Sequence, residues 1–232
     1  MADYQVVYEP SDDTYLMLDA LAIDFNTDNN HNDSVANQQR IKNTTNTLEI
    51  GCGTGVSSIF LAKLLEKKAQ AQLLQTHELI YHHHHIVTDI NPNAIRIAKE
   101  TASQNGINLN TFETHLCDLA TPLLKSYKHS IDVLIFNPPY VPTPNDEVGS
   151  DGIEASWAGG TDGRLVIDRT LPQIDVLLSR PNGVAYMITV DDNKPEQIAS
   201  IMMEKYGIIV QPFLRRRARN EFLTVLKMSF QH

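Results

Sequence analysis

The fold is decided by the stretch Glu49-Ile50-Gly51-Cys52-Gly53-Thr54-Gly55, which joins a short apolar run to a helical pattern. Glycines at such a junction let the chain turn sharply and let a ligand approach the backbone. The spacing is G-x-G-x-G, and Val56 stands where a dinucleotide-binding loop needs its third glycine. The loop therefore predicts a nucleoside site that uses Glu49, Gly51, Gly53 and Gly55, and the alternative is a glycine-rich turn without a ligand.

Outward from this loop, apolar runs alternate with helical patterns, which is typical of an α/β fold. We predict a mostly parallel sheet with helices on both faces. Asn91 is a good N-cap for a helix that begins at Pro92 and ends before Gly106. The predicted strands cover residues 47–50, 86–90, 110–116, 131–136, 184–190, 208–214 and 221–230. The other predicted helices cover 12–25, 56–67, 164–178, where Pro172 should break or kink the helix, and 195–206.

The length of 232 residues fits one domain, 1–232, that carries two low-complexity insertions. The first, at about 26–46, is rich in Asn, Asp, Gln and Thr. The second, at about 67–85, ends in four consecutive histidines, His82 to His85. Adjacent side chains diverge on a helix or a strand, so we expect no metal site there and interpret the histidines as incidental loop composition.

Composition limits the partners and the compartment. The net charge of −9 argues against direct binding of nucleic acid, whose binders usually present a basic surface. No apolar run approaches the roughly 20 residues that span a bilayer, so no membrane contact is expected. Cys52 and Cys117 are too few for a disulfide framework or a structural zinc site. We expect a cytoplasmic protein, with the nucleus as a second compartment.

Two aspartates follow predicted strands. Asp89, with Ile90 after it, ends the strand after the glycine loop, where a carboxylate can accept hydrogen bonds from both ribose hydroxyls of a nucleoside. A helix cap is the alternative role, but Asn91 is better placed for it. Asp118 follows the next strand, where it can accept from an adenine amino group, although aspartate is common wherever a strand ends.

The stretch Asn137-Pro138-Pro139-Tyr140 follows the strand predicted at 131–136. The Asn137 side-chain oxygen and the Pro138 carbonyl can each accept an N–H from a planar nitrogen. Pro138 and Pro139 fix the backbone that aims those acceptors, and Tyr140 can stack on a flat group. We predict catalysis by positioning and polarisation of an amide or amine nitrogen, without a strong base or a metal. A proline-rich turn is the alternative.

With these motifs in place, the sequence closely resembles the HemK family of glutamine N5-methyltransferases that modify translation release factors. The resemblance covers nearly all of the chain outside the insertions. It is carried by Tyr8-Glu9-Pro10-Ser11-Asp12-Asp13-Thr14, the glycine loop, Thr88-Asp89-Ile90-Asn91-Pro92, Asn137 to Tyr140, and the block from Gly152 through Trp157 to Gly160 with Gly163-Arg164 after it.

The resemblance implies a Rossmann-like class I fold, a seven-stranded sheet with one antiparallel strand, and S-adenosylmethionine as cofactor. It assigns cofactor contacts to Thr14, Glu49, Gly51, Asp89, Asp118, Leu119 and Asn137. Because the chain reaches its glycine loop by Gly51, it is similar to the eukaryotic and archaeal branch. That branch implies a heterodimer with a small zinc-binding activator subunit, and the Gly-Gly-Gln loop of a class 1 release factor as substrate.

The block around Trp157 fits a wall of the substrate site. Glu154 and Arg164 can anchor a peptide main chain beside Trp157. The rest of the predicted substrate site consists of Asn137, Pro138, Pro139 and Tyr140. A buried Trp in a rigid loop is the alternative. Three other functions remain open: methylation of a protein lysine such as a histone lysine, N6-adenine methylation of nucleic acid, and a catalytically idle scaffold.

Overall fold

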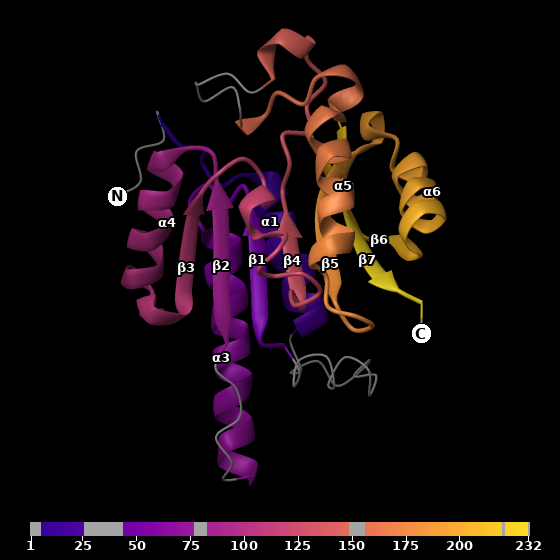
Figure 1. Cartoon of the computed structure of the whole chain (residues 1–232). Helices are drawn as coiled ribbons and strands as arrows, with labels where there is room; N and C mark the ends of the chain where they lie inside the picture. The colour runs from indigo at the N-terminus through magenta and orange to yellow at the C-terminus, as the bar shows by residue number, and fades with distance from the viewer. Residues whose placement is uncertain (1–5, 26–43, 77–82, 149–155, 220, 232) are drawn as a thin grey trace.

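The computed structural model describes residues 6–25, 44–76, 83–148, 156–219 and 221–231. Helices and strands alternate along the chain, as predicted, and Figure 1 labels them. The helices are α1 (Asp12–Phe25), α3 (Val56–Thr76), α4 (Pro92–Gln104), α5 (Leu165–Leu177) and α6 (Pro195–Tyr206). The strands are β1 (Asn46–Ile50), β2 (His84–Asp89), β3 (Phe112–Leu116), β4 (Val133–Phe136), β5 (Val184–Val190), β6 (Ile208–Ala218) and β7 (Glu221–Phe230).

The strands form one seven-stranded sheet in the order β3-β2-β1-β4-β5-β7-β6. β1 to β5 pair in parallel, and β7 lies antiparallel between β5 and β6. The predicted α/β fold and the single antiparallel strand are confirmed. The order reverses direction between β1 and β4, so the loops after these two strands diverge at the carboxyl edge of the sheet. Ligands of open α/β sheets bind at such a point.

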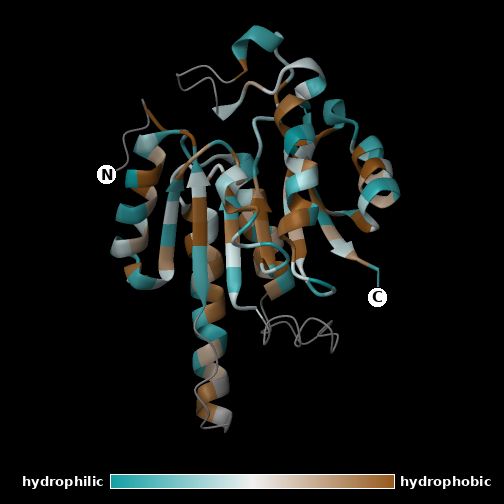
Figure 2. Ribbon diagram, viewed as in Figure 1, coloured by the Kyte–Doolittle hydropathy of each residue, from teal (hydrophilic) through white to brown (hydrophobic). Residues whose placement is uncertain are grey.

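Helices cover both faces of the sheet: α1, α3 and α4 lie on one face and α5 and α6 on the other (Figure 1). Because side chains alternate along a strand, neighbouring residues of β4 enter different cores. Ile135 packs with α1 and α3, whereas Phe136 packs with α5. A strand covered on both faces reads as a continuous apolar run, as β4 does with Val133–Phe136, which is brown in Figure 2.

Several predicted boundaries are corrected. Helix α3 continues past Lys67 to Thr76, so the second insertion begins as helix. Residues 110–111 belong to a 3₁₀ turn, β6 extends to Ala218, and Pro172 lies within an unbroken α5. The first insertion, predicted at about 26–46, lies outside the described residues between 26 and 43, and β1 already begins at Asn46.

The interpretation of the histidines as loop composition is wrong for His84 and His85, which belong to β2, whereas His83 lies just before this strand. His85 is buried, its Nδ1 lies 2.8 Å from Thr47 Oγ1, and burial lowers its pKa to about 3. It is therefore a neutral core residue. In the described part of the chain no group of His, Cys, Asp and Glu could hold a metal ion, and no helix is long and apolar enough to cross a membrane.

Candidate functional site

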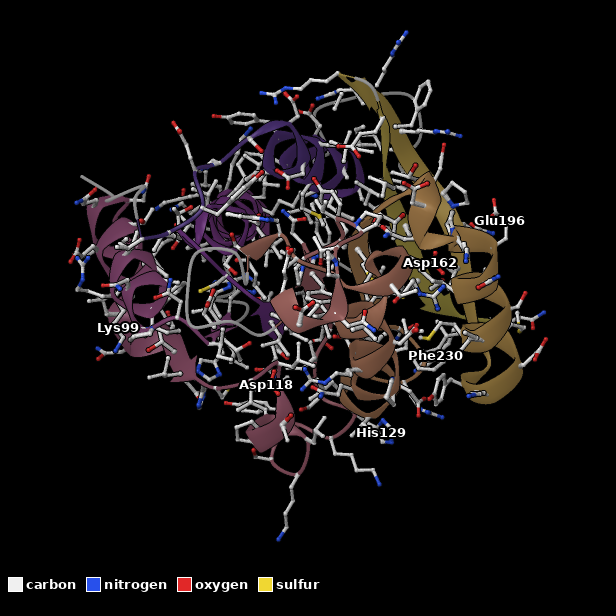
Figure 3. The ribbon with its side chains drawn as sticks, turned by 90° about the horizontal axis from the view of Figure 1, so that it is seen from above. Lys99, Asp118, His129, Asp162, Glu196 and Phe230 are labelled. Carbon is white, nitrogen blue, oxygen red and sulfur yellow. The ribbon has the colours of Figure 1, made fainter. Side chains whose placement is uncertain are left out.

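A cavity of about 450 Å³ opens at the carboxyl edge of the sheet, where the order of the strands reverses. Figure 3 looks onto this edge, with Asp118 labelled on the side of α4 and Asp162 near the start of α6. Loops after β1, β2, β3 and β4 line the cavity together with the start of α1. Most of the predicted cofactor residues lie in its wall: Thr14, Glu49, Gly51, Gly53, Asp89, Ile90, Asp118, Leu119 and Asn137.

Asp89 holds the glycine loop. Its Oδ2 accepts the N–H of Gly53 at 2.9 Å, and its Oδ1 accepts that of Asn91 at 2.8 Å. The pKa of Asp89 lies above its usual value, because the effect of burial outweighs the lowering effect of the hydrogen bonds from backbone N–H groups. A Cβ added at Gly51 or Gly53 would meet nothing within 4 Å, so the loop backbone is open to a ligand on the cavity side. The predicted capping role of Asn91 is confirmed, since its Oδ1 accepts the N–H of Asn93.

Glu49 is a buried carboxyl group at the end of β1. Its Oε2 accepts the N–H of Ser58 at 3.0 Å. Burial raises its pKa to about 7, against the lowering effect of the serine hydrogen bonds. A positive charge placed in the cavity would favour the ionised form of this group.

Gly55 serves packing and does not line the cavity. A Cβ at this position would lie 2.9 Å from Ala98 Cβ. Because Gly55 begins the approach of α3 to α4, any side chain would force these elements apart. The third glycine of the motif therefore allows close helix packing, and its contact with the cofactor stays a prediction.

Asp118 lines the opposite part of the cavity from Asn137, at the end of β3. Its Oδ2 accepts a hydrogen bond from Arg169 of α5, and both side chains are about half exposed. Arg169 also lines the cavity and was not predicted. No pattern in the sequence marks it, because its place beside Asp118 comes from the packing of α5 on the sheet.

Asn137 carries the chemically most informative atom of the site. Its Nδ2 donates to Asp13 Oδ2 at 3.1 Å. A carboxylate only accepts, so this bond fixes the orientation of the amide. Asn137 Oδ1 is buried and has no hydrogen-bond partner among the described residues. An unsatisfied buried acceptor costs free energy, and an acceptor beside a ligand cavity is suited to receive an N–H from a ligand.

Asp13 is a site residue that the sequence analysis missed. It is almost completely buried in the first turn of α1. Its Oδ2 also accepts from the Tyr140 hydroxyl at 3.3 Å, and its Oδ1 accepts the N–H of Thr14 at 2.6 Å and the hydroxyl of Ser11 at 2.9 Å. An acid in a first helical turn is ordinarily explained by the helix dipole. Only the tertiary structure brings this one to Asn137.

Pro138 and Tyr140 do not line the cavity, whereas Pro139 does. The ring of Tyr140 packs against the cores on both faces of the sheet, and its hydroxyl lies on Asp13. Burial, with the nearby charge of Asp13, raises the pKa of Tyr140, so this residue stays a neutral donor. The Tyr140 hydroxyl thus braces Asp13, and the stacking of Tyr140 on a flat acceptor group stays a prediction.

A loop packs closely on the backbone of the Asn-Pro-Pro-Tyr turn. Val141 donates to the Trp157 carbonyl at 3.0 Å, and Gly159 donates to the Val141 carbonyl at 2.8 Å. A Cβ at Gly159 would lie 2.5 Å from the Pro139 oxygen. Trp157 is half-buried outside the cavity wall, so its contact with substrate stays a prediction, as does that of Glu154, which lies outside the described residues.

Arg164, predicted to anchor a peptide main chain, is bound to other residues of the protein. The side chain is buried, and its guanidinium donates to Asp168 Oδ1 and, at 3.0 Å, to the Asn193 carbonyl. These bonds use one N–H each of Nε, Nη1 and Nη2 and hold the guanidinium against the protein, so a contact of Arg164 with a peptide stays a prediction. Sequence alone could not distinguish the two roles, because both require a cation near the Trp157 loop.

Gly163 provides a test of this packing. Its φ is +65°, and a Cβ would lie 1.9 Å from the Tyr140 oxygen. Gly207, with φ of +66°, has nothing within 4 Å of its Cβ position. Both alanine variants should lose roughly 1–2 kcal/mol to the left-handed backbone. Gly163→Ala should lose about 1–3 kcal/mol more through the overlap.

Thermal unfolding of the two variants measures this difference. Each kcal/mol should lower Tm by roughly 2–4 °C in a chain of this size. Equal Tm values for Gly163→Ala and Gly207→Ala would show that the loop moves away from Tyr140 at no cost, contrary to the packing described above.

The chain is similar to known methyltransferases. A family model described as a methyltransferase domain matches residues 41–205. The chain is 40% identical over 223 residues to "Methyltransferase HEMK2" of Homo sapiens, covering 96% of this chain and 89% of the relative. It is 35% identical over 232 residues to the "eRF1 methyltransferase catalytic subunit mtq2" of Schizosaccharomyces pombe, covering 98% and 91%.

A solved structure is similar over the whole fold. It is the Mtq2-Trm112 complex of E. cuniculi, which is described as responsible for the methylation of the eRF1 translation termination factor. The TM-score is 0.58 at 22% identity, with 97% of this chain and 99% of that chain covered.

Proposed function

Because the chain belongs to the HEMK2 and Mtq2 family of methyltransferases, we propose that it methylates a release factor. The acceptor is the side-chain amide nitrogen of the glutamine in a Gly-Gly-Gln loop of a class 1 factor. The methyl donor is S-adenosylmethionine. The observation that carries the choice of acceptor is the buried, unpartnered Oδ1 of Asn137 beside the cavity.

The cavity fits a nucleoside with a positively charged substituent. Asp89 and Asp118 both line it. We assign the ribose hydroxyls to Asp89 and the adenine amino group to Asp118. Gly51 and Gly53 leave room for the ligand against the backbone. The acidic groups of this wall, Glu49 among them, favour a cation. When bound, S-adenosylmethionine supplies an electrophilic methyl group on a sulfonium.

The residues around Asn137 suit an amide nitrogen. Such a nitrogen is a weak nucleophile, since its lone pair is delocalised into the carbonyl, and it gains most from exact alignment and from acceptors for its N–H bonds. Asn137 Oδ1 accepts one N–H, and we propose that the Pro138 carbonyl accepts the other. Asp13 orients the Asn137 amide before substrate arrives. Preorganised acceptors of this kind need no reorganisation during the reaction.

Two competing acceptors fit less well. A lysine must first lose a proton, and the nearest described carboxylate, Asp13, already accepts hydrogen bonds from Asn137, Tyr140, Thr14 and Ser11. An adenine in nucleic acid brings a phosphate backbone, which a protein with a net charge of −9 repels. Methylation of lysine and methylation of adenine are both possible outcomes of the experiment below.

We further propose that the chain works as a heterodimer with a small zinc-binding activator of the Trm112 kind. The relative in the solved complex is bound to Trm112. Among the described residues, β3 is paired on one side only, at one edge of the sheet. Leu109, just before β3, and Leu116, at its end, are at least half exposed. An edge strand with apolar side chains is suited to being covered. Since the proposed substrate acts in translation, we propose a cytoplasmic location, with the nucleus as a second compartment.

An acceptor panel tests the proposed activity. The complex of this chain with its activator, and the chain alone, are offered intact release factor, the Gln→Asn variant of its Gly-Gly-Gln loop, histone protein and duplex DNA. Methylation is located by mass spectrometry. Only the intact factor should be methylated efficiently, at the glutamine amide, and the complex should be the more active form. The shorter asparagine withdraws the amide by one methylene and should reduce transfer by on the order of 10²-fold.

Each alternative has its own signature in this panel. Labelling of histone lysine with an unmodified release factor would assign the lysine function, and labelling of adenine would assign the nucleic-acid function. Equal methylation of the Gln and Asn variants would show that alignment of the amide with the methyl group does not limit the reaction.

A further inference from the structure

A buried amide outside the cofactor cavity joins the segments that build the acceptor side of the site. Asn193 ends a short 3₁₀ turn (Asp191–Asn193) after β5, and it is fully buried. Its Oδ1 accepts the N–H of Val190 at 2.8 Å. This bond fixes which way the amide faces, so the two Nδ2 protons point away from β5.

Both protons of Asn193 Nδ2 reach backbone carbonyls of other segments. One goes to Tyr140 at 2.8 Å and the other to Asp162 at 2.9 Å. Asp162 lies in the turn Thr161–Gly163, and Figure 3 shows it close to Glu196 at the start of α6. One side chain therefore ties three loops that are far apart in sequence: the exits of β4 and β5 and the turn at 161–163.

Asn193 and the carbonyl groups of Tyr140 and Asp162 that it binds form a joint between these loops. Other residues pack tightly around this joint. A Cβ at Gly163 would lie 2.4 Å from Asn193 Nδ2 as well as 1.9 Å from the Tyr140 oxygen. Arg164, at the end of the same turn, donates to the Asn193 backbone carbonyl at 3.0 Å. A buried amide is costly to bury unless all its groups are bonded, and here each polar group has a partner.

The joint acts on the end of the Asn-Pro-Pro-Tyr turn opposite to Asp13. Asp13 holds the Asn137 amide and the Tyr140 hydroxyl, whereas Asn193 holds the Tyr140 carbonyl. Neither Asn193 nor its partners are the residues that hold the glycine loop, which is anchored by Asp89. Displacing a reacting group by about 1 Å can slow an enzyme by roughly 10²-fold. Loss of the joint should therefore impair transfer and spare cofactor binding.

We propose that Asn193 is a positioning residue, which holds the Asn137–Tyr140 turn against the 161–163 turn and so aims the acceptors of the proposed methyl transfer. The inference rests on the proposed function for its kinetic consequence. Its structural consequence, the coupling of two loops, does not depend on which acceptor is methylated.

Two variants separate positioning from general stability. Asn193→Asp keeps the acceptor for Val190 and replaces both donors with an oxygen that repels the two carbonyls; Asn193→Ala removes the side chain without adding a charge. Thr189→Val is the control, because Thr189 is equally buried in β5 but its hydroxyl reaches the Thr224 carbonyl and not the turn. All are measured as the complex with the activator.

In release-factor methylation, both Asn193 variants should lose roughly 10–100-fold in kcat. Calorimetry should give a Kd for S-adenosylmethionine within about twofold of the parent, and its stoichiometry counts the folded sites by which kcat is normalised. Thr189→Val should keep its kcat per site. A variant that only weakens the fold would lower Tm and the number of sites, with kcat per site unchanged.

Hydrogen exchange gives a readout that needs no substrate. Amides of 141–143 and 159–165, including the Val141 and Gly159 bonds between the two loops, should exchange faster in both Asn193 variants. Amides of 52–59 in the glycine loop should not change. Unchanged exchange at 141–143, or a kcat per site equal to the parent, overturns the proposal. A parent complex inactive on release factor, with the exchange difference present, would instead reject the proposed substrate and leave the joint in place.

Discussion

Asn137→Ala should lower methyl transfer by on the order of 10²–10³-fold, the range for removing one preorganised group that acts on the transition state. The alanine lacks the buried Oδ1 that we propose receives an N–H of the acceptor, and it also releases Asp13 Oδ2 from its contact with the amide. Single-turnover kinetics with the activator complex measure this loss. Cofactor affinity should fall only modestly, since the polarised bonds belong to the acceptor nitrogen.

Asn182→Ala is the matched control for Asn137→Ala. Asn182 is exposed in the turn before β5, at the end of the strand away from the cavity, and does not line the cavity. It should have parental kinetics. Turnover of Asn137→Ala close to that of the Asn182 control would remove Asn137 from the polarising role and leave alignment by the cavity as the main source of catalysis.

Asp89→Ala should weaken S-adenosylmethionine binding more than the loss of any other single side chain. Each charge-assisted bond to a ribose hydroxyl is worth about 1.5–3 kcal/mol. Loss of two such bonds corresponds to a Kd raised by roughly 10²–10⁴-fold. The variant also loses the hydrogen bond of 2.9 Å from the Gly53 N–H to Asp89 Oδ2. This bond holds the glycine loop with its backbone open to a ligand.

Titration calorimetry measures the effect, with Asp118→Ala for comparison. Asp118 is half exposed and already paired with Arg169, so its truncation should cost less. Unchanged affinity in Asp89→Ala would contradict the ribose assignment. An Asp118→Ala variant that binds more weakly than Asp89→Ala would shift the main polar contact to the other end of the cavity.

Local sequence patterns predicted most of the helices and strands, because these elements depend largely on residues that are close together in the sequence. β5, β7 and α6 have the predicted bounds, and Asn91 caps α4 as expected. Apolar runs of strand length and helical periodicity are properties of neighbouring residues. The errors lie where tertiary contacts extend or replace a local preference, as in the continuation of β6 to Ala218 alongside β7.

The cofactor side of the site was also determined by sequence. The glycine loop and Asp89 stand at the ends of consecutive parallel strands, and such ends meet at one edge of a sheet by topology alone. Their residue types then indicate the chemistry: the glycines leave the backbone open to a ligand, and Asp89 provides a carboxylate acceptor. The structure places both in one cavity and shows that Gly55 belongs to helix packing.

Only the tertiary structure decided how the acceptor side is held. Asp13 lies 124 residues from its partner Asn137, and Asn193 lies 53 residues from Tyr140. Arg164 is turned inward for the same reason, to close a contact between loops. Hydrogen bonds over such separations leave no periodic trace in the sequence, since each needs only one donor and one acceptor brought together by the packing of the sheet and its helices.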